Sequence, residues 1–195
     1  LYRFGFTVDA PSPEGQRPAP LSVSIRRIEF PDAAKGERIL GVTGNETAYI
    51  GGARWVTAAE NLFDDDLRSA FASRADQIRV LNRGEPGTPP YVLQVTVTTF
   101  EARYAPGAQN AAPTVVVTAR AQLRTTPERN SGEGAIRPEQ GAAIERTFSI
   151  SQPAAANRVS AIVDAFDRAS RDLNAQIADW TIQSAPASVR QGVGR

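Results

Sequence analysis

The chain has 195 residues and a formal net charge of +1, and it contains no His, Cys or Met. Without His and Cys, a Ser-His-Asp triad, a Cys-His dyad and the usual zinc sites are all excluded. A metal site would have to use carboxylates, carbonyl groups and water, which suit calcium or magnesium. The charge is small and the arginines are scattered, so the composition indicates no nucleic-acid partner.

The first 20 residues predict an extended segment. LYRFGF is a short aromatic start, and residues 9–20 form a Pro-rich stretch typical of a spacer. Because the chain has no Met, we expect it to be a mature or truncated form with residues upstream of Leu1. We divide it into this segment (1–20), a single α/β domain (21–182) and a flexible tail (183–195). No apolar run approaches the roughly 20 residues that would span a bilayer.

The first half of the domain predicts short strands and a hairpin. Residues 21–25 alternate between apolar and polar, and the change of phase before Ile28 indicates a bulge or a strand end. Two further strand candidates flank Gly44-Asn45, a pair typical of two-residue hairpin turns.

The segment RWVTAAENLFDDDLRSAF predicts the first helix, over residues 57–74. Thr57 and Glu60 have the spacing of a capping box, in which each side chain bonds the backbone amide of the other residue. The apolar positions behind them recur at helical spacing. They are Leu62, Phe63, Leu67, Ala70 and Phe71.

The second half predicts three long strands and a closing helix. Residues 77–82 form a short strand, while 91–104 and 113–126 alternate strongly and should pair as an antiparallel hairpin. Residues 143–151 give another alternating strand through Ile144, Phe148 and Ile150. A helix starting near Pro153 follows, since Pro is favoured in a first turn. Its apolar stripe comprises Val159, Ile162, Phe166, Leu173, Ile177 and Trp180.

Three consecutive aspartates, Asp64, Asp65 and Asp66, are candidate metal ligands. Neighbouring helical positions point about 100° apart, so these carboxylates should not converge on one ion. Acidic residues also suit the first half of a helix, where the dipole is positive. We therefore expect no metal site and no cofactor. GVTGNET lacks the Gly-Lys-Ser/Thr ending of a phosphate loop and leads into a strand.

Tyr49, Arg54 and Trp55 lie where the hairpin meets the first helix. Large amphipathic rings commonly cover the end of a core, which is one interpretation of Tyr49 and Trp55. The other is an anchor for a partner, since Trp and Tyr are enriched among residues that dominate binding energy. We take these three residues as the candidate partner-binding site.

The order of elements resembles that of the ABC-type transport auxiliary lipoproteins, a PqiC-like family. The resemblance rests on an aromatic start (Tyr2-Arg3-Phe4), the SVSIRRIEFP strand, an Arg-Ile-Leu hairpin, Arg54-Trp55 before a helix, the YVLQVTVTTFEA strand and a closing amphipathic helix. It covers about residues 1 to 182. The chain departs from the family in lacking a lipidated N-terminal Cys.

The resemblance implies a fold, a location and partners. The fold is an α/β two-layer sandwich, with a mixed, mainly antiparallel sheet and two principal helices on one face. The location is the periplasmic face of the bacterial outer membrane, reached through a lipid anchor on a Cys upstream of Leu1. The partners are an MCE-domain protein and ABC transporter subunits that carry lipids. Direct lipid binding and homo-oligomerisation are left open.

Two other functions are compatible with the composition. One is a periplasmic hydrolase or carbohydrate-active enzyme that uses a pair of carboxylates, although none of the 21 Asp and Glu residues is singled out by its surroundings. The other is a free-standing periplasmic binding module. With no marked catalytic residue, we predict a protein that acts by contact and is not an enzyme.

Overall fold

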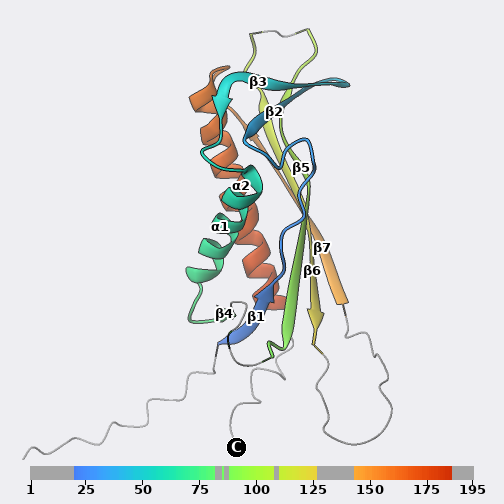
Figure 1. Ribbon diagram of the computed structural model, residues 1–195, viewed down its shortest axis with the longest axis vertical. Helices are drawn as coiled ribbons and strands as arrows, with labels where there is room; N and C mark the ends of the chain where they lie inside the picture. The colour runs from blue at the N-terminus through green and yellow to red at the C-terminus, as the bar shows by residue number, and fades with distance from the viewer. Residues whose placement is uncertain (1–19, 82–84, 86–87, 108–109, 127–142, 186–195) are drawn as a thin grey trace, which may run out of the picture.

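The computed structural model describes residues 20–81, 85, 88–107, 110–126 and 143–185. Residues 1–19 of the predicted N-terminal segment and residues 186–195 of the predicted tail lie outside this description, as do residues 127–142. The described chain forms two layers, a seven-stranded mixed sheet and two helices that cover one of its faces (Figure 1). The elements are β1 (Leu21–Ile25), β2 (Arg38–Thr43), β3 (Glu46–Arg54), α1 (Ala59–Ala72), β4 (Ile78–Val80), β5 (Tyr91–Tyr104), β6 (Thr114–Thr125), β7 (Ala143–Pro153) and α2 (Val159–Ser184).

Strand β5 is the centre of the sheet. Antiparallel β6 pairs along one edge of β5, as predicted, and antiparallel β7 continues the sheet from β6. The other edge is shared, because β1 lies parallel to the first part of β5 and β2 lies parallel to its last part. Strand β4 extends the sheet from β1, and β3 returns antiparallel to β2. The two longest pairings are antiparallel, in agreement with the predicted two-layer sandwich.

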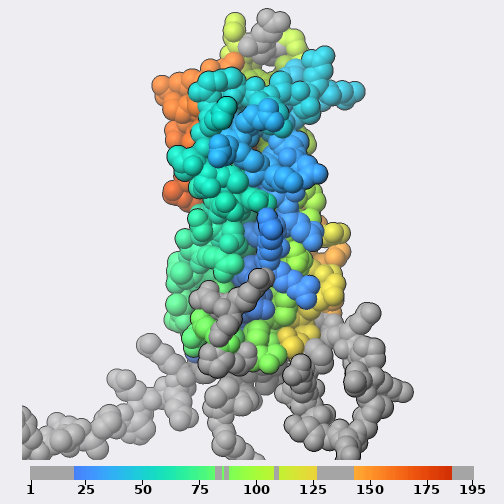
Figure 2. All heavy atoms as spheres, in the orientation of Figure 1, coloured from blue at the N-terminus to red at the C-terminus, as the bar shows by residue number. Residues whose placement is uncertain are grey.

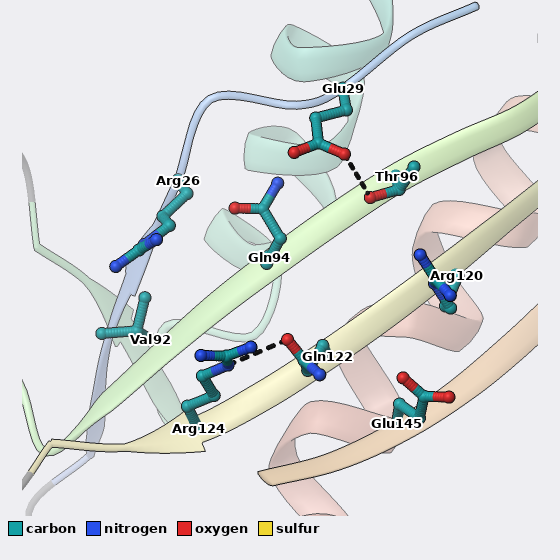
Figure 3. Close-up of a pocket in the computed structure, with 9 residues that line it drawn as sticks. All are labelled: Arg26, Glu29, Val92, Gln94, Thr96, Arg120, Gln122, Arg124 and Glu145. Atoms are coloured by element: carbon teal, nitrogen blue, oxygen red, sulfur yellow. Dashed lines mark hydrogen bonds between the residues drawn. The ribbon is translucent and has the colours of Figure 1, made fainter. Parts of the chain in front are cut away.

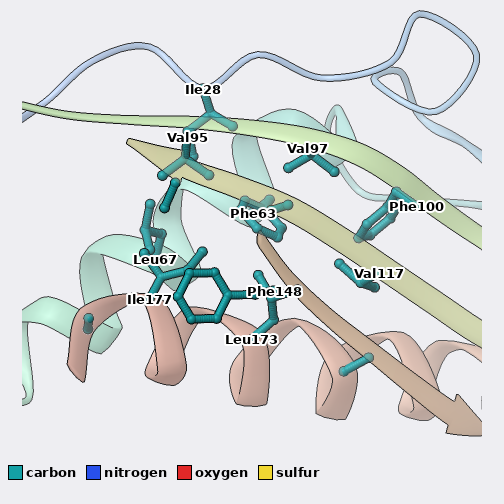
Figure 4. Packing of buried hydrophobic residues seen from close by; sticks show 14 of the residues in the cluster. Ile28, Phe63, Leu67, Val95, Val97, Phe100, Val117, Phe148, Leu173 and Ile177 are labelled. Atoms are coloured by element: carbon teal, nitrogen blue, oxygen red, sulfur yellow. The ribbon is translucent and has the colours of Figure 1, made fainter. Parts of the chain in front are cut away.

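The core lies between the sheet and the helices (Figure 4). Alternation along β5 and β6 places one set of side chains against the helices. The positions that this alternation predicts to face inward are all buried, namely Tyr91, Leu93, Val95 and Val97 on β5 and Val115, Val117, Ala119, Ala121 and Leu123 on β6. A bulge between Val97 and Thr99 shifts the alternation, so that Phe100 also faces inward. Of the three apolar positions on which the β7 prediction rested, Phe148 is buried, Ile150 packs half-buried against the core, and Ile144 is 43% exposed.

Helix α1 begins at Ala59, and the predicted capping box is wrong. Ala58 occupies the N-cap position and makes no side-chain cap bond. The first amides are satisfied by the preceding loop instead, since Ala59 N–H donates to the Gly36 carbonyl (3.0 Å) and Glu60 N–H to the Lys35 carbonyl (3.3 Å). These carbonyls supply what a capping side chain would otherwise provide. The helix also ends two residues earlier than predicted, at Ala72.

Helix α2 begins at Val159 rather than near Pro153. Pro153 is the last residue of β7 and is opposite Thr114 of β6 in the strand register. Proline has no backbone N–H to donate. It is tolerated here because β7 is an edge strand, with a partner strand on one side only. Val159, in the first turn, is 39% exposed, whereas the other predicted stripe residues of α2 are buried.

The two helices run side by side in the same direction across the sheet (Figure 1). The buried Asn174 of α2 donates from its Nδ2 to Asp66 Oδ2 of α1 at 2.7 Å. Near the ends of both helices, Arg74 forms an ion pair with Asp179 at 2.6 Å. Polar contacts therefore fix how the helices lie against each other.

The hairpin of β2 and β3 projects from the body of the molecule (Figure 2). It turns at Gly44, whose φ of 58° is in the left-handed region that favours glycine, and so confirms the predicted turn. None of the nine residues of β3 is fully buried. None of the helices in the described residues is both long enough and apolar enough to span a bilayer.

Candidate functional site

An open apolar groove of about 420 Å³ lies where the end of β3 meets both helices. We call it the Trp55 groove. The chain segment after β3 forms one wall, and the first halves of α1 and α2 form the others. Its lining residues are Arg54, Trp55, Val56, Ala59, Leu62, Phe63, Asp66, Phe100, Val163, Phe166, Asp167 and Ser170.

Trp55 is half-buried in this groove, with its ring packed against the edge of the core. The ring meets Phe166 edge-to-face, with centroids 5.4 Å apart, and lies 6.2 Å from the ring of Phe100. Its backbone N–H donates to the Glu37 carbonyl at 2.7 Å, which fixes the turn out of β3. Trp55 is therefore held rigidly while part of its ring stays accessible.

The rim of the groove combines one exposed apolar side chain with charged ones. Val56 is 94% exposed, although it follows directly after Trp55. Arg54 is exposed, and its guanidinium makes no hydrogen bond or ion pair to any described residue. Across the groove, Asp167 forms an ion pair with Arg171 at 2.8 Å. The groove thus offers an apolar floor with a free positive charge at one side.

Tyr49 lies apart from this groove. Its hydroxyl donates to the Ala33 carbonyl at 3.1 Å, and the Arg38 guanidinium carbon lies 3.7 Å from the centre of its ring. Tyr49 lines a separate hollow of about 250 Å³ beside Tyr104. Of the three residues predicted as a partner-binding site, the structure brings Arg54 and Trp55 into one groove and leaves Tyr49 on the hairpin.

The pKa shifts of Tyr104, Asp32 and Lys35 arise outside the groove. Burial raises the pKa of Tyr104 above its usual range. In the loop before β2, a hydrogen bond from Lys35 lowers the pKa of Asp32, and the same bond raises the pKa of Lys35. That bond is 2.7 Å long and lies in the loop whose carbonyls receive the first amides of α1.

The three consecutive aspartates diverge as the helical spacing predicts. Asp64 forms an ion pair with Arg68 at 2.8 Å, Asp65 is exposed, and Asp66 accepts the amide of Asn174. Within the described ranges, no group of three or more acidic residues gathers closely enough to hold a metal ion.

Several groove residues were not singled out from the sequence. Phe63, Phe100 and Phe166 form an aromatic cluster under Trp55, with Phe100 and Phe166 centroids 4.7 Å apart. Phe63 and Phe166 were predicted only as members of buried helical stripes, and Leu62 proves half-exposed. No sequence pattern marked Val56 or Val163 as groove residues, because the groove forms only where the end of β3 meets α1 and α2.

Comparison with known proteins gives a family and a fold. The family model for the ABC-type transport auxiliary lipoprotein component matches residues 2–178. A solved structure of a Xanthomonas campestris protein superposes with a TM-score of 0.71 at 19% identity, over 92% of this chain and 94% of that chain. A hypothetical protein from Chlamydia trachomatis gives a TM-score of 0.53 at 10% identity, over 85% and 99%. No curated protein matches the chain significantly.

Proposed function

This chain belongs to the ABC-type transport auxiliary lipoprotein family, and we propose that it is a non-catalytic adaptor of an MCE-linked lipid transport system. In this role it sits on the periplasmic face of the outer membrane, tethered by a lipid anchor upstream of Leu1. It acts by contact, holding the transport machinery close to that membrane. Its direct partner is the MCE-domain protein, which an ABC transporter supplies with lipid.

The observation that carries the proposal is the Trp55 groove. A core aromatic residue normally has its ring enclosed, whereas Trp55 packs on Phe166 and Phe100 and still borders an open groove. Tryptophan held rigidly at the edge of a pocket loses little conformational entropy on binding, and it is among the residue types enriched in binding hot spots. The groove therefore suits an apolar side chain of a partner.

The charges around the groove favour a particular partner segment. The Arg54 guanidinium at the rim is paired with no residue that the structure describes, so an acidic group next to the inserted apolar side chain would gain an ion pair. Such rim charges contribute mainly to orientation and association rate. We therefore propose that the MCE-domain protein presents an apolar residue flanked by an acidic one.

Val56 gives a cleaner test of docking than Trp55. Removing the Trp55 ring would also disturb Phe100 and Phe166, so Trp55→Ala mixes lost binding with lost stability. Val56 is 94% exposed, so Val56→Glu should change the free energy of unfolding by no more than about 0.5 kcal/mol. It places a carboxylate at the groove, where it would repel the partner's acidic group and oppose burial of its apolar side chain, and it should weaken partner binding about tenfold or more, or ~1.4 kcal/mol.

The matched control is Ile144→Glu, an apolar-to-acidic change at a residue that is 43% exposed on β7 and does not line the groove. Co-purification with the MCE-domain protein should be lost for Val56→Glu and retained for Ile144→Glu, with both variants melting like the wild type. Equal retention by both variants would rule out the groove as the docking site.

A further inference from the structure

A second concave site lies on the face of the sheet opposite the helices (Figure 3). It has a volume of about 380 Å³ and is bordered by three arginines, Arg26, Arg120 and Arg124. We call it the arginine cup. Its other lining residues are Glu29, Val92, Gln94, Thr96, Gln122 and Glu145.

The strand register explains why these side chains gather. Along β6, the residues between the buried positions point away from the core, which places Arg120, Gln122 and Arg124 on one face. The register sets Arg124 opposite Val92 of β5, and Arg120 opposite Thr96. Arg26 follows β1, and its backbone N–H donates to the Leu93 carbonyl at 2.9 Å, which brings it beside Val92.

The guanidinium groups of the cup retain donors for a ligand. Arg124 uses its Nε to bond Gln122 Oε1 at 2.9 Å, which orients the group and leaves its terminal nitrogens available. The guanidinium groups of Arg26 and Arg120 make no hydrogen bond or ion pair to any other described residue. Arg26 and Arg124 lie toward the Val92 end of the cup (Figure 3).

The acidic residues of the cup do not cancel this charge. Glu29 lies toward the Thr96 end, where its Oε2 accepts the Thr96 hydroxyl at 2.9 Å (Figure 3). Glu145 projects from β7, opposite Gln122. Three guanidinium groups therefore face two carboxylates, and the Val92 end holds two arginines and neither acid. That end has the charge of an anion site.

We propose that the arginine cup binds a phosphate-bearing small ligand, with the phosphate held between Arg26 and Arg124. Guanidinium is planar and presents paired N–H donors that match two phosphate oxygens, which makes such contacts stronger than neutral hydrogen bonds. The volume lies in the range of small-molecule sites. Gln94 and Gln122 supply amide groups for the remainder of the ligand, and Val92 gives the cup an apolar floor.

The same chemistry is offered by a soluble phosphate compound and by a phospholipid headgroup. Two probes distinguish these sources. Inorganic phosphate, titrated calorimetrically, represents the soluble source. Phosphatidylcholine vesicles with and without phosphatidylglycerol, assayed by flotation, represent the lipid source. Saturable binding of either probe that depends on Arg26 and Arg124 supports the proposal and identifies which source the cup accepts.

The decisive variant is the double substitution Arg26→Gln with Arg124→Gln. It removes both charges from the Val92 end and should weaken binding about tenfold or more, because two charge-assisted contacts are lost. Both residues are exposed, so the melting temperature should not change. Arg168→Gln is the control, since Arg168 is also exposed but lies on α2, on the other side of the molecule.

A second variant guards against an indirect effect. Gln122→Ala keeps all three arginines but removes the hydrogen bond that orients the Arg124 guanidinium. Because both charges at the Val92 end remain, it should weaken binding less than the double substitution does. The proposal is overturned if neither probe binds the wild type saturably, or if Arg168→Gln weakens binding as much as the double variant. It does not depend on the Trp55 groove, so Val56→Glu should bind the probes like the wild type.

Discussion

Asn174 is a buried polar side chain of α2 that hydrogen-bonds across to the other helix, α1. Its amide is fully buried and donates to Asp66, while the hydroxyl of the neighbouring buried residue Thr181 bonds within its own helix. A buried donor without an acceptor carries its full desolvation cost. Asp66 therefore acts as the acceptor that allows an amide to lie between α1 and α2.

Two substitutions in the aspartate run test this role. Asp66→Ala should lower the free energy of unfolding by about 1 to 3 kcal/mol, because the Asn174 amide loses its acceptor. Asp65→Ala removes an adjacent, exposed carboxylate, and its free energy of unfolding should stay within about 0.5 kcal/mol of the wild-type value. Urea denaturation measures both. Equal effects of the two substitutions would show that the Asp66 contact adds nothing to stability.

At the scale of elements, α1 has a buried face and a face that borders the Trp55 groove. Leu67 is fully buried, so Leu67→Ala should destabilise the protein by about 2 to 5 kcal/mol through lost burial and a new cavity. Leu62 lies five residues earlier and is half-exposed in the groove. Leu62→Ala should therefore lower the free energy of unfolding by roughly 1 kcal/mol or less.

Denaturation midpoints at an unchanged m-value would measure these two costs. A Leu62→Ala variant as unstable as Leu67→Ala would mean that the groove wall belongs to the closed core, and the open groove would then be an incorrect description of this surface.

The sequence predicted the strands better than the helix starts, for a physical reason. Alternation along β5 and β6 reports directly which side chains face the core, so the inward set was predictable. The start of α1 depends instead on carbonyls of Lys35 and Gly36, which lie more than 20 residues earlier. The start of α2 depends on the length over which β7 pairs with β6. Such long-range bonds leave no local pattern.

At the scale of the whole molecule, the candidate sites were also only partly predictable, because they depend on residues far apart in the sequence. Arg54 and Trp55 were predicted because they precede the first helix, but their groove also needs Phe166 from a helix more than 100 residues away. The arginine cup was not predicted, because scattered arginines become neighbours only through the register of β5 and β6 and the end of β1.

The two sites lie on opposite faces of the sheet layer, which allows them to be tested separately. The Trp55 groove lies on the helical side, and the arginine cup lies on the open face of the sheet. An adaptor with this arrangement can contact a protein partner on one side and a phosphate-bearing ligand on the other. Variants at one site should leave binding at the other unchanged.

The most direct test of the adaptor role is site-specific photocrosslinking in the bacterial envelope. A photoreactive amino acid replaces Val56 at the groove in one strain and Ile144 outside it in another, and crosslinked products are identified by mass spectrometry. The proposed role predicts a crosslink to the MCE-domain protein from position 56 and none from position 144. No crosslink to that protein from position 56, or equal crosslinking from both positions, would contradict it.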